Sequence, residues 1–276
     1  MAHSDYRAAD LARFPAKRRL SHLCNAARIA VLAAFLVAPQ AMAAEFKPDF
    51  RTLGIGQKAS ELDAASYDSF ACGSNGNVPL KALSGWTDFM QCAPDENGLR
   101  EVAVEFGNRA ERMSQLFQEQ YNEELWIQQF GGTRLANFPV ILSLLFDEDG
   151  VSRAFRAVTD SRAAVQDRGR AYLLRFRIYS HYGSSDWDCV RYPPHAGRTP
   201  VGQAYVDEVC QKQIDGKSVR VEAHVFRKAG QTGVDSYGMF EAGQFESMTR
   251  WDAWDASYPI KVPAEGENGV RFHGKP

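Results

Sequence analysis

The sequence has none of the features that mark the more unusual classes of protein. Its 22 glycines follow no period, and it has no series of long apolar runs. Hydrophobic residues make up 45% of the 276 positions, and 32 basic residues nearly balance 34 acidic ones. This composition is ordinary for a globular protein. It excludes a collagen-like repeat, a wholly disordered chain and a polytopic membrane protein.

Motifs that name a specific chemistry are also missing. The sequence contains no His-x-His or His-x-x-x-His pair, no Cys-x-x-Cys and no Gly-x-Ser-x-Gly. Gly54-Ile-Gly56 is followed by no third glycine. The sequence therefore predicts no metal, no cofactor and no named catalytic residue. Carboxylate pairs for sugar hydrolysis stay open, because they come from distant parts of a chain and nothing singles out one pair.

Residues 1–43 are typical of a secretory signal peptide. A basic stretch that ends at Arg28 precedes the apolar run 29–37, and the small residues that end at Ala43 fit a cleavage site. The apolar run is too short to span a bilayer comfortably. We expect cleavage after Ala43, with residues 44–276 as the exported region.

Two other interpretations fit this leader less well. A twin-arginine signal would use Arg18 and Arg19, but Ser21 and His22 stand where apolar residues are wanted. Lipidation at Cys24 would need that cysteine to follow the apolar run, and it precedes the run. We therefore expect a periplasmic or secreted protein without stable membrane insertion after cleavage.

Removal of the leader changes the charge of the chain. Residues 1–43 hold more basic than acidic side chains, so the exported region is acidic. Binding to nucleic acid depends on basic side chains that neutralise phosphates, and binding to an anionic membrane surface needs them too. The exported region has no cluster of them, so we expect neither partner.

Four cysteines remain after the leader: Cys72, Cys92, Cys189 and Cys210. An even number of cysteines in an exported chain predicts disulfides. Sequence alone allows three pairings, but the four residues fall into two local couples. We therefore expect Cys72–Cys92 and Cys189–Cys210. The alternative is a metal site, but no histidine lies at ligand spacing beside any of the four.

Alternation and turn residues predict most of the secondary structure. The expected strands are Trp86–Cys92, Leu99–Phe106, Phe138–Phe146, Val151–Asp160, Ser218–Lys228 and Gln244–Asp255. The expected helices are a short polar one at Ser60–Tyr67, the strongly periodic 109–129, and one from Thr199 to about Ile214. Residues 172–182 fit a strand or a helix, with the helix slightly favoured, and we expect the last dozen residues to be frayed.

The acidic turn between the third and fourth of these strands has two interpretations. Asp147 and Asp149 have the first spacing of a calcium-binding EF-hand loop, but the remaining ligands and the flanking helices are missing. Gly150 suits the positive φ of a tight hairpin turn. We expect a hairpin turn here.

Together these elements predict an α+β protein, in which an antiparallel sheet or hairpins are packed by helices on one face and tied by two disulfides. No low-complexity linker divides the exported region. It is expected to form a single region, with repeated helix-hairpin modules at 44–107, 108–165 and 166–260 as a finer division.

The first of these modules resembles a known family. Gly54-Ile-Gly-Gln stands ahead of the expected short helix, and Gly85-Trp86 and Leu99–Phe106 follow. This arrangement resembles the helix-plus-sheet modules of the small outer-membrane assembly lipoproteins and of the beta-lactamase-inhibitor protein. The resemblance implies protein binding and supplies no catalytic residue. This chain lacks the cysteine that begins the mature lipoproteins, so the resemblance does not imply a lipid anchor.

Large aromatic side chains are the remaining candidates for a site. Trp251 and Trp254, with Phe245 and Tyr258, could line a binding surface. We expect an exported, non-catalytic envelope accessory or binding protein that contacts another envelope protein or a polymer. The alternatives are a secreted hydrolase of envelope glycan or peptide that uses scattered acidic residues, and a secreted enzyme inhibitor. An exposed aromatic patch would favour the binding protein, and a concave pocket with two or more carboxylates would favour the hydrolase.

Overall fold

The computed structural model describes residues 54–65, 67–106, 133–261 and 268–276. The chain divides into units 1–45 and 46–276, and every described residue belongs to the second. The expected signal peptide and the expected helix at 109–129 lie outside the described residues. Within the described part, no helix is long and apolar enough to cross a membrane.

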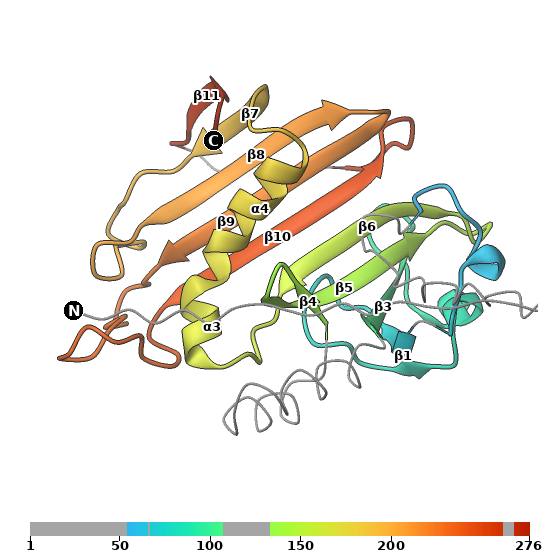
Figure 1. The fold of residues 1–276 in the computed structure, drawn as a ribbon, viewed down its shortest axis with the longest axis horizontal. Helices are drawn as coiled ribbons and strands as arrows, with labels where there is room; N and C mark the ends of the chain where they lie inside the picture. Colours follow the sequence, from blue (N-terminus) through green and yellow to red (C-terminus); the bar gives the residue numbers. More distant parts are fainter. Residues whose placement is uncertain (1–53, 66, 107–132, 262–267) are drawn as a thin grey trace, which may run out of the picture. The chain divides into compact units, whose positions relative to one another are not determined.

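Antiparallel strands dominate the described part of the chain (Figure 1). In chain order they are β1 Tyr67–Cys72, β2 Ala82–Leu83, β3 Arg100–Phe106, β4 Arg134–Leu135, β5 Phe138–Phe146, β6 Ser152–Thr159, β7 Trp187–Arg191, β8 Val206–Ile214, β9 Lys217–Phe226, β10 Glu246–Asp255 and β11 Val270–Gly274. The helical elements are the 3-10 turns η2 Ala59–Glu61 and η3 Trp86–Gln91, then α3 Val165–Arg170, η4 Ala171–Leu173 and α4 Leu174–His181.

Two antiparallel meanders join to form one sheet. The first runs β1-β3-β5-β6 and the second β7-β8-β9-β10, and β6 pairs with β10 where they meet. The order across the sheet is β11-β7-β8-β9-β10-β6-β5-β3-β1-β2, with β4 added to β5. Strands from all three ranges 44–107, 108–165 and 166–260 therefore lie in the same sheet.

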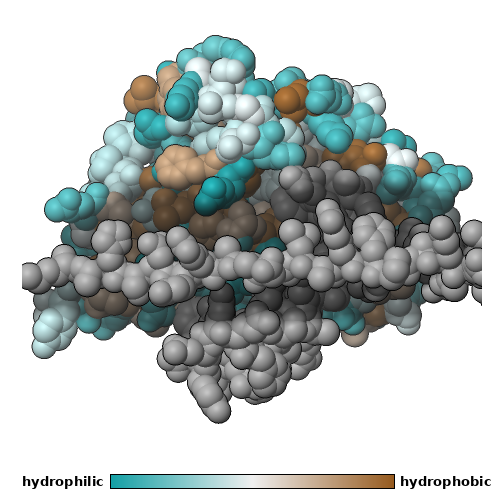
Figure 2. Space-filling view, viewed as in Figure 1, coloured by the Kyte–Doolittle hydropathy of each residue, from teal (hydrophilic) through white to brown (hydrophobic). Residues whose placement is uncertain are grey.

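The segment α3-η4-α4 connects the two meanders and packs on one face of the sheet, here called the helical face (Figure 1). The Thr249 hydroxyl of β10 donates to the carbonyl oxygen of Ala171 at 2.8 Å, and the ring of Tyr182, which follows α4, lies 5.7 Å from that of Trp251. Residues 171–181 are helical, so the helical interpretation of 172–182 is the right one. Among the coloured residues of Figure 2, hydrophobic side chains form small patches between hydrophilic ones.

Alternation on β9 shows how the sequence separates the two faces. Val219, Val221 and Val225 are completely buried, while Arg220 and Glu222 point the other way. Successive side chains of a strand point to opposite faces, and β-branched residues pack well on a pleated surface. The valines therefore face the helices, and the charged residues form a second face, here called the polar face.

The two expected disulfides are confirmed. Cys72 is bonded to Cys92, which ties β1 to the end of η3, and Cys189 is bonded to Cys210 across the β7–β8 pair. All four residues are buried in the same core cluster. Each bridge closes a loop of roughly 20 residues, which the chain-entropy model values at about 3 kcal/mol.

Five of the expected strands are confirmed within two residues of their ends: β3, β5, β6, β9 and β10. The acidic turn between β5 and β6 is a hairpin turn. Gly150 has φ 73°, and the Asp147 carboxylate accepts from the Val151 N–H at 2.8 Å and from Arg153 Nε at 2.7 Å. That carboxylate is therefore occupied by the turn itself.

The expected helix from Thr199 to Ile214 is wrong, because this segment contains strand β8. β8 pairs with β9 along its whole length, through a two-residue turn at Asp215 and Gly216. Both turn residues have positive φ, 50° and 72°, as the tightest hairpin turn requires, and Asp-Gly is a preferred sequence for it. Strand pairing and the bridge at Cys210 thus override the helix-start signal at Thr199-Pro200.

Three smaller expectations are also wrong. The expected strand Trp86–Cys92 is the 3-10 helix η3, which begins after Gly85 and is held by a hydrogen bond from the Ser84 N–H to Asp88 Oδ2 at 2.8 Å. The expected helix at 60–67 shrinks to the turn η2, because β1 already begins at Tyr67. The expected frayed end contains β11, which pairs with β7.

The described part of the chain is therefore mostly antiparallel sheet, with a short helical segment and two disulfides. The expected α+β class is met only in part, because the helical segment is short and packs mainly on β9 and β10. What matters for the site is the other face, on which the charged side chains of several strands meet.

Candidate functional site: a cavity on the polar face

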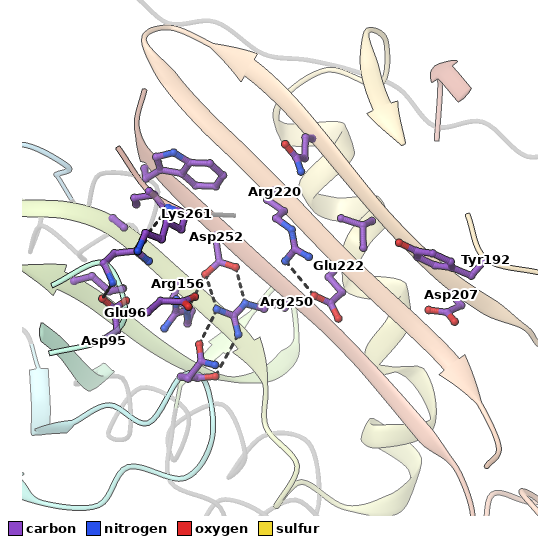
Figure 3. Close-up of a pocket in the computed structure, with 18 of the residues that line it drawn as sticks. Asp95, Glu96, Arg156, Tyr192, Asp207, Arg220, Glu222, Arg250, Asp252 and Lys261 are labelled. Carbon is purple, nitrogen blue, oxygen red and sulfur yellow. Dashed lines mark hydrogen bonds and ion pairs between the residues drawn. The ribbon is translucent and has the colours of Figure 1, made fainter. Parts of the chain in front are cut away.

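A row of charged side chains crosses the seam between the two meanders. Arg156 of β6 pairs with Asp252 of β10, Asp252 pairs with Arg220 of β9, and Arg220 pairs with Gln211 of β8. Directly paired residues of antiparallel strands present their side chains on the same face. The four side chains therefore lie in a row on the polar face, and Figure 3 labels three of them, Arg156, Asp252 and Arg220.

These residues line a cavity of about 1070 Å³. One end is apolar and is here called the apolar corner; it consists of Leu99, Leu145, Ala154, Trp254 and Ile260. The first four form a buried cluster of their own, and Ile260 packs against it. The rest of the wall is largely polar and includes five basic and five acidic side chains, so these charges balance.

Asp252 is the centre of the charged wall. Its Oδ1 lies 2.7 Å from Arg156 Nε and its Oδ2 lies 2.6 Å from Arg250 Nε. Burial raises the pKa of Asp252, but the charges of Arg156 and Arg250 outweigh burial and hold the pKa below its usual value. Asp252 is therefore an ionised carboxylate at neutral pH, unsuited to donate a proton.

The two arginines beside Asp252 have further partners. Arg156 Nη1 donates to Glu101 Oε2 at 2.7 Å, and Arg250 Nη2 donates to Asn75 Oδ1 at 2.9 Å. Burial lowers the pKa of Arg156, but the charges of Asp252 and Glu101 outweigh it and raise the pKa overall. Arg156 is about as buried as its partners, with 11% of its side chain exposed. Both arginines in this part of the wall therefore have two side-chain partners, while Glu101 Oε1 is buried without a hydrogen-bond partner among the described residues.

Arg220 is less fully paired. Only 8% of the residue is exposed, and its Nη1 donates to Glu222 Oε2 at 3.1 Å. The carboxylate of Glu222 is itself one-third exposed, and Arg220 Nε is buried without a hydrogen-bond partner among the described residues. A buried guanidinium with an unsatisfied N–H is costly in free energy, so Arg220 has capacity for a further acceptor.

Two further acidic residues of the cavity, Asp207 and Asp95, are also held by partners. Asp207 Oδ2 lies 2.5 Å from Arg198 Nη1, and Asp95 Oδ1 accepts from the N–H groups of Asn97 and Leu99 at 2.8 and 2.9 Å. These carboxylates cap a loop or neutralise an arginine.

A second hollow of about 390 Å³ continues along the polar face. It shares Asn75, Glu222 and Arg250 with the first and adds His224 and Phe245. Burial lowers the pKa of His224 and outweighs the nearby carboxylates, so the imidazole is neutral at neutral pH. The two hollows make the site longer than a compact small-molecule pocket.

The structure places the four expected aromatic residues in different environments. Trp251 is 3% exposed and lies in the core of the helical face, with its ring 4.7 Å from that of Phe155. Trp254 is 8% exposed and lines the apolar corner. Tyr258 packs against that corner. Phe245, also buried, lines the second hollow.

These residues do not form the exposed patch that we expected. Trp251 and Trp254 are three positions apart on one strand, and residues an odd number of positions apart point to opposite faces. Trp251 is buried on the helical face beside Phe155 and Tyr182, and Trp254 is buried in the apolar corner on the polar face. A binding role for Trp254, Phe245 and Tyr258 stays a prediction.

Sequence reasoning missed the residues that build the cavity. The alternation of Arg220 and Glu222 with the valines of β9 was visible, but it indicates only which face a side chain takes. Arg156 and Asp252 lie 96 residues apart, and their pairing follows from the join between β6 and β10. Among the described residues, no group of three or more histidine, cysteine and acidic residues could hold a metal ion.

Comparisons of the chain with protein-family models, with curated proteins and with solved structures found no match. The resemblance of residues 54–106 to envelope modules therefore stays a prediction. Fold and site define this protein in physical terms alone, as a disulfide-linked antiparallel sheet with a charge-balanced cavity on one face.

Proposed function

We propose that this protein is an exported, non-catalytic binding protein of the cell envelope, which contacts another protein or a polymer through the cavity on the polar face. The observation that carries the proposal is the state of the cavity's carboxylates. Asp252 is held ionised by two arginines, and Asp207 and Glu222 each have an arginine partner.

A hydrolase that acts through two acids needs one carboxyl group whose pKa is raised, so that it carries a proton at neutral pH. The cavity does hold several carboxylates, as a hydrolase would. The pKa of Asp252 is lowered, and Asp207, Glu222 and Asp95 are engaged by an arginine or by loop N–H groups, while Glu96 is an exposed residue of the wall. These contacts favour recognition over proton transfer.

The composition of the wall supports binding to a macromolecule. Arginine, tryptophan and tyrosine are the residues most enriched where partners bind tightly, and the cavity contains Arg220, Trp254 and Tyr192. Two hollows that share residues provide a site long enough for a segment of chain. A secreted enzyme inhibitor would be one member of this class.

The disulfides support the proposed location. Disulfides form and persist in oxidising compartments and are rare in the cytosol. Two buried bridges, together with the expected signal peptide, support a periplasmic or secreted protein.

The test isolates tagged protein from envelope fractions and compares the wild type with Lys261→Glu, which reverses a charge at the cavity rim. Arg177→Glu is the matched control, because Arg177 is an exposed residue of α4 on the helical face. We expect the same partner with wild type and control, and its loss with Lys261→Glu. Turnover of envelope glycan or peptide substrates that is lost in Glu222→Gln would instead establish the hydrolase.

A further inference from the structure

We infer that the cavity binds an extended peptide segment, with an apolar side chain of that segment in the apolar corner and a side-chain carboxylate on Arg220. This inference rests on the proposed function, because it names the ligand of the same site. It follows from three features of the cavity: an interrupted charge pattern, an aliphatic end and the spacing between the two.

The first feature is the row of charges across the sheet. The row alternates Arg156, Asp252 and Arg220, and the next position is the neutral Gln211. Asp252 is already shared by two arginines, so Arg220 has only the one-third exposed Glu222. A ligand carboxylate beside Arg220 would balance the second arginine of the row and accept from the spare N–H groups of Arg220.

The burial of Arg220 distinguishes this position from an ordinary surface charge. The residue is 92% buried in a cavity wall, and its Nε has no partner among the described residues. Arg250, by contrast, donates to Asp252 and Asn75. A ligand acceptor would therefore add more hydrogen bonding at Arg220 than at its satisfied neighbour.

The second feature is the apolar corner. Leu145, Ala154 and Trp254 come from three neighbouring strands of the polar face, and Leu99 and Ile260 close the corner from the flanking loops. This is a concave site with mainly aliphatic walls, which suits a branched apolar side chain. An oligosaccharide would gain less here, because it has no such side chain to bury.

The third feature is spacing. Arg220 pairs with Asp252, and Trp254 lies two residues further along β10. Standard strand dimensions put the Cα atoms of Arg220 and Trp254 about 8 Å apart. Side chains two positions apart in an extended peptide point the same way and are about 7 Å apart. The cavity therefore matches the pattern apolar-x-acid in an extended segment.

The experiment is isothermal titration of the purified protein with three capped peptides and one sugar. The probe is Ac-Ser-Leu-Ser-Glu-Ser-NH2, whose only charge is the glutamate. In the second peptide glutamine replaces glutamate, in the third serine replaces leucine, and the sugar is the tetramer of N-acetylglucosamine. We expect the probe to bind with Kd below about 1 mM and each altered peptide to bind roughly tenfold more weakly or worse.

Protein variants locate the site. Arg220→Gln should weaken the probe roughly tenfold but leave the glutamine peptide unchanged, since only the carboxylate contact is lost. Ile260→Ser should weaken the binding of both the probe and the glutamine peptide. The controls are Arg177→Gln on α4 and Leu80→Ser, two exposed positions that do not line the cavity. Thermal unfolding checks that each variant folds, and the peptide changes need no folded variant.

The outcomes separate this inference from the proposed function. Equal binding of the glutamate and glutamine peptides would overturn it, as would failure of the probe to bind. Sugar binding that Arg220→Gln weakens would overturn the peptide inference and leave a polymer-binding protein. If no probe binds and Lys261→Glu still isolates the wild-type partner, both the inference and the proposed function fail.

Discussion

Arg156 and Asp252 are cross-strand partners at the seam between the two meanders, with Nε and Oδ1 2.7 Å apart. The pair joins the two halves of the sheet on the same face that carries the cavity. Loss of the pair should therefore lower the stability of the fold and change the shape of the site.

Asp252→Asn should destabilise the protein by about 3–5 kcal/mol, because it leaves Arg156 and Arg250 buried beside a neutral amide. Urea unfolding measures the change. Asp188→Asn is the matched control: Asp188 pairs with Arg271 at 2.5 Å, but about half of each side chain is exposed, so its loss should cost less than about 1 kcal/mol. Equal effects of the two substitutions would contradict this account of the seam.

The same carboxylate should make stability depend on pH in the acid range. The pKa of Asp252 is lowered in the folded protein, so its contribution is present above the unfolded value of about 3.9 and is lost as pH falls through the folded pKa. The free energy of unfolding should thus fall in acid below about pH 4, and less steeply in Asp252→Asn. Parallel pH profiles for both proteins would argue that other acids govern this loss.

Removal of the bridge across β7 and β8, by changing Cys189 and Cys210 together to alanine, should cost about 3 kcal/mol of stability. Denaturant unfolding of the variant and of the wild type, each with and without a reductant, measures it. The reductant should destabilise the wild type more than the variant, which retains one bridge. A variant as stable as the wild type would show that strand pairing alone holds β7.

The tight turn between β8 and β9 should be sensitive to a Cβ atom. Gly216 has φ 72°, so Gly216→Ala should cost about 1–2 kcal/mol through backbone strain. Gly85→Ala is the control, because Gly85 has extended backbone at φ 172° and no described atom lies within 4 Å of the place that a Cβ would take. Thermal unfolding that shows the same loss for both variants would rule out strain as the cause.

Local signals in the sequence predicted the strands that have clear alternation and the disulfides that join near neighbours. The valines of β9 show this well, because period and residue type agree. The error at β8 came from taking Thr199-Pro200 as a helix start, whereas Asp215-Gly216 marks the hairpin in the structure.

The cavity was beyond prediction for a different reason. Its central contacts join Arg156 to Glu101, 55 residues away, and to Asp252, 96 residues away. No local period encodes which strands meet at the seam, so acidic residues that looked interchangeable in the sequence have distinct roles in the structure. The opposite faces of Trp251 and Trp254 follow from their odd spacing on β10, but their burial depends on the long-range packing of each face.

Site-specific photo-cross-linking tests the central claim most directly. A benzoylphenylalanine at Gln211 lies in the cavity, and one at Arg177 lies on exposed α4 on the helical face. When cells that export the protein are irradiated, the account predicts a discrete cross-linked partner from position 211 and none from position 177. Absence of an adduct at 211, or the same adduct from both positions, would contradict binding through the polar-face cavity.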